Sequence, residues 1–273
     1  KAVKRTVELN QEHRKQITYV LCTNSINLTE EILHLCKEYN ILISTSLDGP
    51  AFIHNHNRGK TDSYNRVIEG INKVRNYLGA DKVSALMTTS ELSINHPKEI
   101  VDNYILNGFN NIFLRPLNPY GLALNSTNWN IYFDKFFEFY KQALNYIIDI
   151  NIKGKFFVEE FTAILLRKIL TPFTTGFVDL QSPAGIINSV VVYNYDGYVY
   201  ASDESRMLAE YHDYTFRLGH VTDNYENLFY GDKAQQIALI WGTEFIAGCA
   251  DCAFQSYCGA DPVRNHSTQD RKS

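Results

Sequence analysis

The first half of this 273-residue chain alternates short apolar segments with amphipathic ones, and this alternation limits the fold more than any other feature. Buried strands are predicted at 17–22, 41–47, 82–88 and 111–115. Helices are predicted at about 27–39, 63–78 and 95–108, and the first ten residues also have a helical pattern. Apolar strands separated by helices predict a parallel sheet covered by helices, and therefore an α/β fold.

Capping residues set the predicted helix ends. Asn27 is predicted to cap the first helix between strands, with Glu30 as its capping-box partner. Asn95 is predicted to cap a later helix, with Pro97 in its first turn and Gly108 as its stop.

The ends of the strands are where functional side chains are expected, because α/β folds place their sites where parallel strands end and loops begin. These positions are 22–24, 46–50, 88–89 and 115–118.

The second half has a different character. Two aromatic-rich helices are predicted at 128–150 and 156–170. A hairpin is predicted over 187–201, because Asp-Gly at 196–197 lies between β-forming residues. A last helix is predicted at about 225–241.

Three of the five cysteines lie within ten residues, at Cys249, Cys252 and Cys258. Closely spaced thiolates are ligands of zinc and of iron–sulfur clusters. With His266 as a fourth ligand they would suit zinc, so the residues alone leave both metals open. The other two, Cys22 and Cys36, are predicted to be buried apolar residues.

Composition excludes several classes of protein. The net charge is −4 without a basic block, so nucleic acid is not an expected partner. No apolar run approaches the ~20 residues that span a bilayer, so no membrane partner is expected. An odd, clustered set of cysteines favours metal binding over disulfides, and with it a cytoplasmic location.

Several phrases of the chain resemble radical S-adenosylmethionine (SAM) enzymes with a C-terminal SPASM-type cluster domain, in particular the His-Xaa-Ser system maturases. These phrases are 21–24, 44–50, 113–121, 193–197, 201–204 and the cysteine tail. The resemblance implies part of a (β/α)6 TIM-like barrel over 1–125, connecting helices over 126–171, and an incomplete α+β iron–sulfur domain over 172–273.

The resemblance also implies a function. Such enzymes are oxidoreductases that cleave SAM to a 5′-deoxyadenosyl radical, which modifies a ribosomally made precursor peptide. The implied cofactors are SAM and [4Fe–4S] clusters, and the implied electron donor is a flavodoxin or ferredoxin. Two alternatives stay open: a non-catalytic, zinc-stabilised peptide-binding module, and an enzyme like the anaerobic sulfatase maturases.

The resemblance assigns roles to individual residues. Asn24 and Ser46 match positions near SAM, and Arg58 or Arg66 is expected to pair with the SAM carboxylate. Asp203 matches a proton-accepting aspartate of the sulfatase maturases. The auxiliary [4Fe–4S] cluster is assigned to Cys249, Cys252 and Cys258.

Residues nearby receive plainer interpretations. Asp48 is predicted to be a turn residue, and His54 and His56 are predicted to be solvated loop histidines. Neither Glu204 nor Arg206 receives a role.

The chain also departs from the family. Residues 1–273 contain no Cys-x3-Cys-x2-Cys loop for the cluster that reduces SAM, and this loop is expected before Lys1. Ser182, Ser202 and Pro262 occupy positions where relatives have cysteines, and a fourth ligand is expected beyond Ser273. We therefore expect a fragment with one auxiliary cluster that does not cleave SAM alone.

Overall fold

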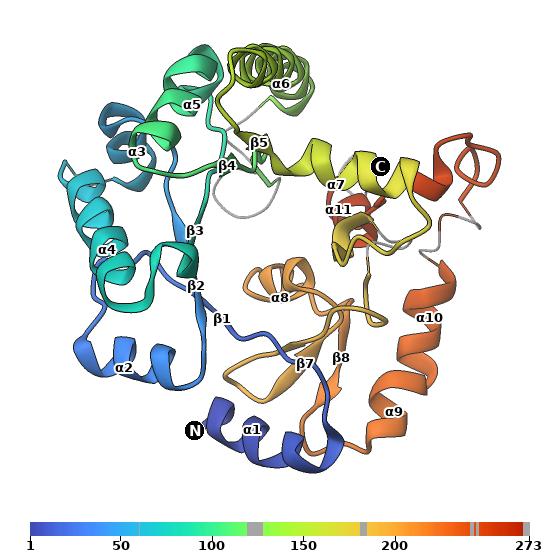
Figure 1. The fold of residues 1–273 in the computed structure, drawn as a ribbon. Coiled ribbons are helices and arrows are strands. Elements are labelled where there is room, and N and C mark those ends of the chain that lie inside the picture. The colour runs from blue at the N-terminus through green and yellow to red at the C-terminus, as the bar shows by residue number, and fades with distance from the viewer. Residues whose placement is uncertain (60, 119–127, 181–184, 241–242, 244–245, 270–273) are drawn as a thin grey trace. The chain divides into compact units, whose positions relative to one another are not determined.

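The computed structural model describes residues 1–59, 61–118, 128–180, 185–240, 243 and 246–269 (Figure 1). The chain forms two compact units. The first contains Lys1–Leu117 and Asn130–Glu160, and the second contains Asn118–Trp129 and Phe161–Ser273.

The first unit is built on parallel strands. Strands β1 (Val20–Cys22), β2 (Leu42–Ser46) and β3 (Val83–Leu86) form one sheet in that order. Strands β4 (Asn111–Ile112) and β5 (Val158–Glu159) form a second parallel pair. An isolated parallel bridge between Thr89 and Pro116 links the ends of β3 and β4. Among the described residues these strands do not close into a barrel.

Helices accompany these strands as the alternating sequence predicts, and α4 packs on β2 and β3 (Figure 1). The helices of this unit are α1 (Ala2–His13), α2 (Glu30–Glu38), α3 (Ala51–Arg58), α4 (Ser63–Leu78), α5 (Pro97–Leu106) and α6 (Trp129–Ile152). The predicted helix at 63–78 and its end at Gly79 are confirmed.

Two predicted caps are wrong. The N-cap of α2 is Thr29, whose hydroxyl accepts the Ile32 N–H, because Asn27 itself belongs to a turn that precedes the helix. Helix α5 begins at Pro97 after His96, because Asn95 belongs to a short 3-10 turn.

The second unit contains the predicted hairpin. Strands β6 (Val192–Tyr193) and β7 (Tyr198–Tyr200) pair antiparallel around Gly197, whose φ is +84°. A third strand, β8 (Arg217–His220), pairs with β7 and was not predicted, because Arg-Leu-Gly-His lacks a clear β pattern.

Helices α8 (Asp203–Ala209) and α9 (Tyr225–Tyr230) pack on this small sheet, and further helices belong to the same unit. These are α7 (Glu160–Leu170), α10 (Asp232–Ile240) and α11 (Pro262–Gln269). The single helix predicted at 225–241 is two helices, because the chain leaves the helical conformation at Gly231 (φ −72°, ψ 173°). The predicted helix at 156–170 likewise begins with the short strand β5, which pairs with β4. In the described part of the chain, no helix is long and apolar enough to cross a bilayer.

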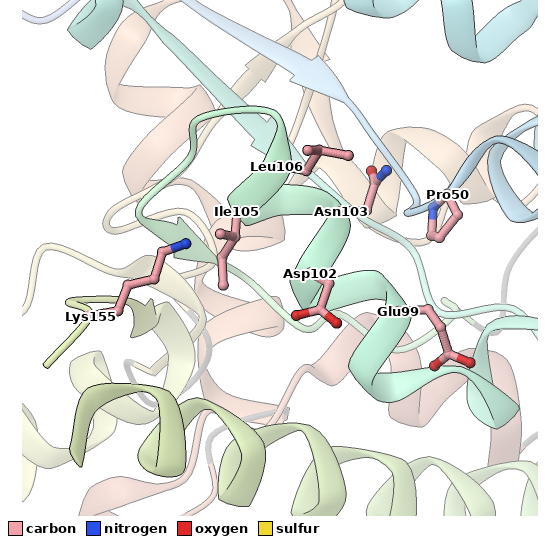
Figure 2. A pocket seen from close by; sticks show the side chains of 7 residues that line it. All are labelled: Pro50, Glu99, Asp102, Asn103, Ile105, Leu106 and Lys155. Carbon is pink, nitrogen blue, oxygen red and sulfur yellow. The ribbon is translucent and has the colours of Figure 1, made fainter. Parts of the chain in front are cut away.

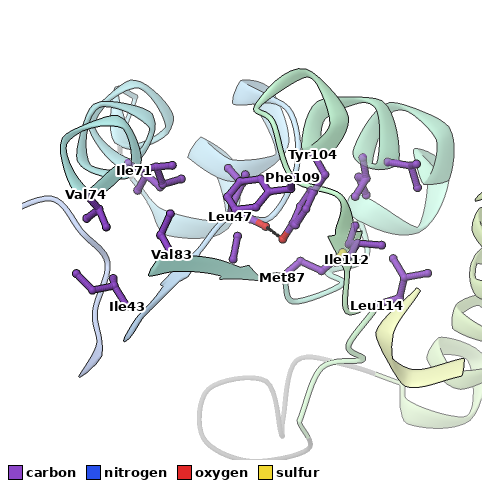
Figure 3. Close-up of a cluster of buried hydrophobic side chains, with 14 of the residues drawn as sticks. Ile43, Leu47, Ile71, Val74, Val83, Met87, Tyr104, Phe109, Ile112 and Leu114 are labelled. Atoms are coloured by element: carbon purple, nitrogen blue, oxygen red, sulfur yellow. Dashed lines mark hydrogen bonds between the residues drawn. The ribbon is translucent and has the colours of Figure 1, made fainter. Parts of the chain in front are cut away.

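The core of the first unit lies between the strands and their helices. Figure 3 shows Ile43, Leu47, Val83 and Met87 from the strand segments packed with helical side chains that include Ile71. Tyr104 of α5 is fully buried in this core, and its hydroxyl donates a 2.6 Å hydrogen bond to the Leu47 carbonyl (Figure 3). This bond satisfies a carbonyl at the point where β2 has ended.

We expect Tyr104→Phe to lower the free energy of unfolding of the first unit by about 1–2 kcal/mol, because it leaves the buried Leu47 carbonyl without its donor. Urea unfolding followed by circular dichroism measures this change. The matched control is Tyr146→Phe, which removes a more exposed hydroxyl bonded to Asp102 and should cost less than about 0.5 kcal/mol. Equal losses in the two variants would contradict the prediction.

Candidate functional site

One face of the three-stranded sheet carries small polar side chains. Cys22, Ser44 and Ser84 lie side by side in the register of β1, β2 and β3. These three are exposed or half-buried, whereas the alternating residues Ile43 and Ala85 are buried against the helices. The sheet therefore has an apolar helix-facing side and a second side, here called the inner face, that can accept a polar ligand.

The inner face continues to the carboxyl ends of the strands. Ser46 is in register with Leu86, and Thr88 lies two residues further along the same side. The bridge between Thr89 and Pro116 places Arg115 beside Thr88. Ser46, Thr88 and Arg115 are all half-buried at this edge, where parallel α/β folds bind their ligands.

Asp48 stabilises this edge through hydrogen bonds to two other segments of the chain. Its carboxylate is buried and accepts two hydrogen bonds of 2.7 Å from the Nε and Nη2 atoms of Arg58. Its Oδ1 also accepts the Thr88 N–H at 3.1 Å. Asp48 does lie at the predicted turn, but the sequence did not show that it also joins the end of β2 to α3 and to the end of β3.

The prediction for His54 was wrong. The expected polar loop is helix α3, and His54 is 1% exposed on its buried side, whereas His56 is exposed. A backbone N–H can only donate, so the 3.2 Å contact from Asp48 N makes His54 Nδ1 an acceptor. The proton then lies on Nε2, which is 3.3 Å from Ser63 Oγ. Burial lowers the pKa of His54 and favours this neutral form.

The other two residues assigned to SAM lie near the same strands. Asn24 follows β1, is exposed, and already accepts the Ile26 N–H with its side-chain oxygen. Arg66 is half-buried in the first turns of α4. Both roles remain predictions, whereas the Arg58 guanidinium is already engaged by Asp48.

Asp203, the predicted base, lies in the second unit. It is the first residue of α8 and forms a 3.1 Å ion pair with Arg206 on the helix surface. Ser202, at a position where the sequence resemblance led us to expect a cysteine, caps this helix in a capping box with Ser205.

Glu204 received no role from the sequence, but it lies in a distinctive environment. Burial raises its pKa, and the nearby carboxylates of Asp261, Asp179 and Asp203 raise it further. Asp203 adjoins Glu204 in the sequence, but only the tertiary structure brings Asp179 and Asp261 near them, so no local sequence pattern could have identified this group.

The cysteine tail forms consecutive turns. The Cys252 N–H donates to the Cys249 carbonyl at 3.1 Å, and Cys258 follows the short 3-10 helix Gln255–Tyr257. All three thiols are free, and Cys252 and Cys258 are exposed. Their chemistry suits a thiophilic metal, but within the described residues no three potential ligands are already grouped as a metal site.

The other two cysteines were predicted to be buried apolar residues, and His266 was the possible fourth zinc ligand. Cys36 is buried as predicted, and burial raises its pKa, but Cys22 is exposed because it points to the inner face of β1. His266, the possible fourth zinc ligand, is 2.9 Å from Asp213. Burial opposes ionisation of Asp213, but hydrogen bonds from Thr215 and the pairing with His266 outweigh it and lower the pKa.

A hollow of about 730 Å³ lies elsewhere on the first unit. It is open to solvent and lined mainly by α5, including Glu99, Asp102 and Leu106, together with Lys155 (Figure 2). Because this hollow is lined mainly by residues of α5, it is separate from the small polar side chains of the inner face.

Sequence comparisons with known proteins give a partial match. No protein-family model matches the chain. An uncharacterized protein of Methanothermobacter thermautotrophicus is 31% identical over 132 residues, which cover 48% of this chain and 47% of that protein. The chain thus matches about half the length of this curated relative.

Solved structures resemble a larger part of the chain. Native anSMEcpe with bound AdoMet superposes with a TM-score of 0.73 at 20% identity, covering 94% of this chain and 69% of that one. The same protein with AdoMet and the Kp18Cys peptide gives a TM-score of 0.69 at 19% identity, with the same coverage. The chain therefore has an α/β fold that resembles that of AdoMet-bound anSMEcpe over 94% of its length.

We expect Arg58→Ala to destabilise the first unit by roughly 3 kcal/mol, because it leaves the buried Asp48 carboxylate without its counter-charge. Arg58→Lys should recover part of this loss, since it keeps the charge but not the two-point geometry. Chemical unfolding of the three proteins measures the effect. An Arg58→Ala variant as stable as the wild type would show that the ion pair does not hold this edge.

The lowered pKa of His54 predicts a pH dependence. The unfolded chain binds this proton more readily than the folded one, so stability is present above the ordinary histidine pKa of about 6.5 and is lost as the pH falls below it. His54→Asn, which retains an acceptor near the Nδ1 position, should flatten the stability–pH curve below pH 6.5. His56→Asn on the exposed side of α3 is the control, and an unchanged slope in His54→Asn would contradict the prediction.

Proposed function

We propose that this chain binds SAM on the inner face of its parallel sheet, as part of a radical SAM enzyme that modifies a peptide. One observation carries the proposal: small polar side chains line the carboxyl edge of parallel strands in a fold that resembles an AdoMet-bound enzyme. The peptide substrate is proposed because solved relatives carry the Kp18Cys and Cp18Cys peptides.

Within this proposal, Ser46 binds the ribose and Asn24 lies near the cofactor. Arg66 is the better candidate for the SAM carboxylate, because the Nε and Nη2 atoms of Arg58 are already bound to the buried Asp48. When bound with its reducing cluster, SAM supplies the radical, while this chain positions the reactants and shields them from water.

The second unit is proposed to hold an auxiliary [4Fe–4S] cluster through Cys249, Cys252 and Cys258. Because the free thiols are not gathered in the structure, metal binding would have to draw them together and would contribute to folding. Asp203 is proposed as a proton acceptor in the same reaction, with a flavodoxin or ferredoxin as electron donor.

More specifically, we propose that the chain is similar in function to the His-Xaa-Ser system maturases, because it contains the sequence phrases quoted above. The solved relatives are instead anSMEcpe, an anaerobic sulfatase-maturating enzyme, and this likeness favours the sulfatase-maturing branch as a second candidate. A pull-down of the two precursor types by the purified chain would separate the branches.

We expect the chain to bind S-adenosylhomocysteine, a stable SAM analogue, and Ser46→Ala to weaken this binding about fivefold through the loss of one hydrogen bond. Isothermal titration calorimetry under anaerobic conditions measures both. The control is Ser84→Ala, which removes an exposed hydroxyl from the same face at the start of β3. Absence of binding by the wild-type chain would overturn the proposal.

Metal content tests the second unit independently. After anaerobic reconstitution with iron and sulfide, we expect near-equal iron and inorganic sulfide, with loss of both in the triple variant Cys249→Ser, Cys252→Ser, Cys258→Ser. The double variant Cys22→Ser, Cys36→Ser should retain both. Tightly bound zinc without sulfide would instead support a zinc-stabilised peptide-binding module.

A further inference from the structure

Arg115 is a positively charged residue of the inner face that the cofactor proposal does not use. It follows β4, and its guanidinium lies 5.8 Å from the centre of the Phe113 ring. Phe113 and Arg115 are half-buried, whereas the alternating residues Ile112 and Leu114 are buried on the helix side. Arg115 and Phe113 therefore both belong to the inner face.

The backbone of Arg115 is held firmly. Its carbonyl accepts the Thr89 N–H at 2.9 Å, next to the bridge between Thr89 and Pro116. The buried hydroxyl of Tyr132 donates to the Thr89 carbonyl at 2.6 Å and accepts the Leu117 N–H at 2.7 Å. These bonds fix the ends of β3 and β4, so the backbone of Arg115 has a defined position before any ligand binds.

Within the part of the chain that the structure describes, no carboxylate forms an ion pair with Arg115. Glu159 on the neighbouring strand β5 is in register with Ile112, and therefore lies on the opposite, helix-facing side. Its oxygens accept the Leu114 N–H and the Tyr140 hydroxyl. The buried carboxylate of Glu159 therefore forms its hydrogen bonds on the helix-facing side of the sheet, away from Arg115.

We infer that Arg115 binds a carboxylate of the peptide substrate, so that the enzyme selects an acidic side chain near the modified residue. This inference rests on the proposed function and specifies its substrate class. A single planar guanidinium supported by an aromatic ring matches one carboxylate through two parallel hydrogen bonds. Phosphate sites more often combine several donors with a helix N-terminus or a backbone nest, and Arg115 lies on a strand end instead.

A pooled peptide library tests the inference without knowledge of the natural substrate. Acetylated, amidated pentapeptides with random flanking positions carry either Glu or Gln at the central position. Equilibrium dialysis of the pool against the full chain, saturated with S-adenosylhomocysteine, is followed by mass spectrometry of the retained peptides. We expect the wild type to retain Glu peptides about tenfold over Gln peptides, as for a charge-assisted hydrogen bond.

The variants give the decisive comparison. Arg115→Gln should abolish the preference for Glu, and Arg115→Lys should retain part of it. The matched control is Arg217→Gln in the second unit, because Arg217 also lies over an aromatic ring, 4.4 Å from the centre of Tyr198, and it should leave the preference unchanged. Equal retention of Glu and Gln peptides by the wild type, or an unchanged preference in Arg115→Gln, would overturn the inference.

A second readout separates this inference from the cofactor proposal. We expect Arg115→Gln to change the affinity for S-adenosylhomocysteine less than twofold. If it weakens S-adenosylhomocysteine but not 5′-methylthioadenosine, which lacks the carboxylate, then Arg115 serves the cofactor and the peptide inference is wrong. If the wild type binds neither nucleoside yet still prefers Glu peptides in the unsaturated dialysis, the cofactor proposal fails while the inference about Arg115 stands.

Discussion

The buried carboxylate of Asp48 is the constraint on which the candidate site depends. A charge removed from water must be compensated, and here Arg58 supplies a two-point ion pair while the Thr88 N–H supplies a further hydrogen bond. Each partner comes from a different segment, so one carboxylate fixes the end of β2 relative to α3 and to the end of β3. The inner-face residues Ser46 and Thr88 are held in place by this arrangement.

The residues that follow Asp48 show why the phrase Asp-Gly-Pro occurs at this turn. Gly49 has a φ of +124°, and a Cβ there would lie 2.8 Å from Ile100 Cγ1, so both the backbone and the packing require glycine. Pro50 then becomes the N-cap of α3, the helix that carries His54 and Arg58. The phrase therefore combines a buried anion, a conformation available mainly to glycine and a helix start within three residues.

The two units contribute to the proposed chemistry in different ways. In the first, strand register alone aligns polar side chains on a rigid sheet, which suits the binding of a cofactor and substrate in fixed geometry. In the second, free thiols lie on consecutive turns without a ready-made metal site among the described residues. If it binds the proposed cluster, such a segment would acquire its binding geometry together with the metal rather than present a preformed pocket.

Sequence by itself determined the parallel α/β half, the Asp-Gly hairpin and the strand ends that carry polar residues, because periodicity and turn chemistry are local properties. It missed β5 and β8, since strands of two to four residues are defined by their partners more than by their own pattern. Only the tertiary structure decided that Asp48 is an ion-pair centre and that His54 is buried and neutral. Burial and charge pairing are set by residues six to forty positions away along the chain, and no local pattern records them.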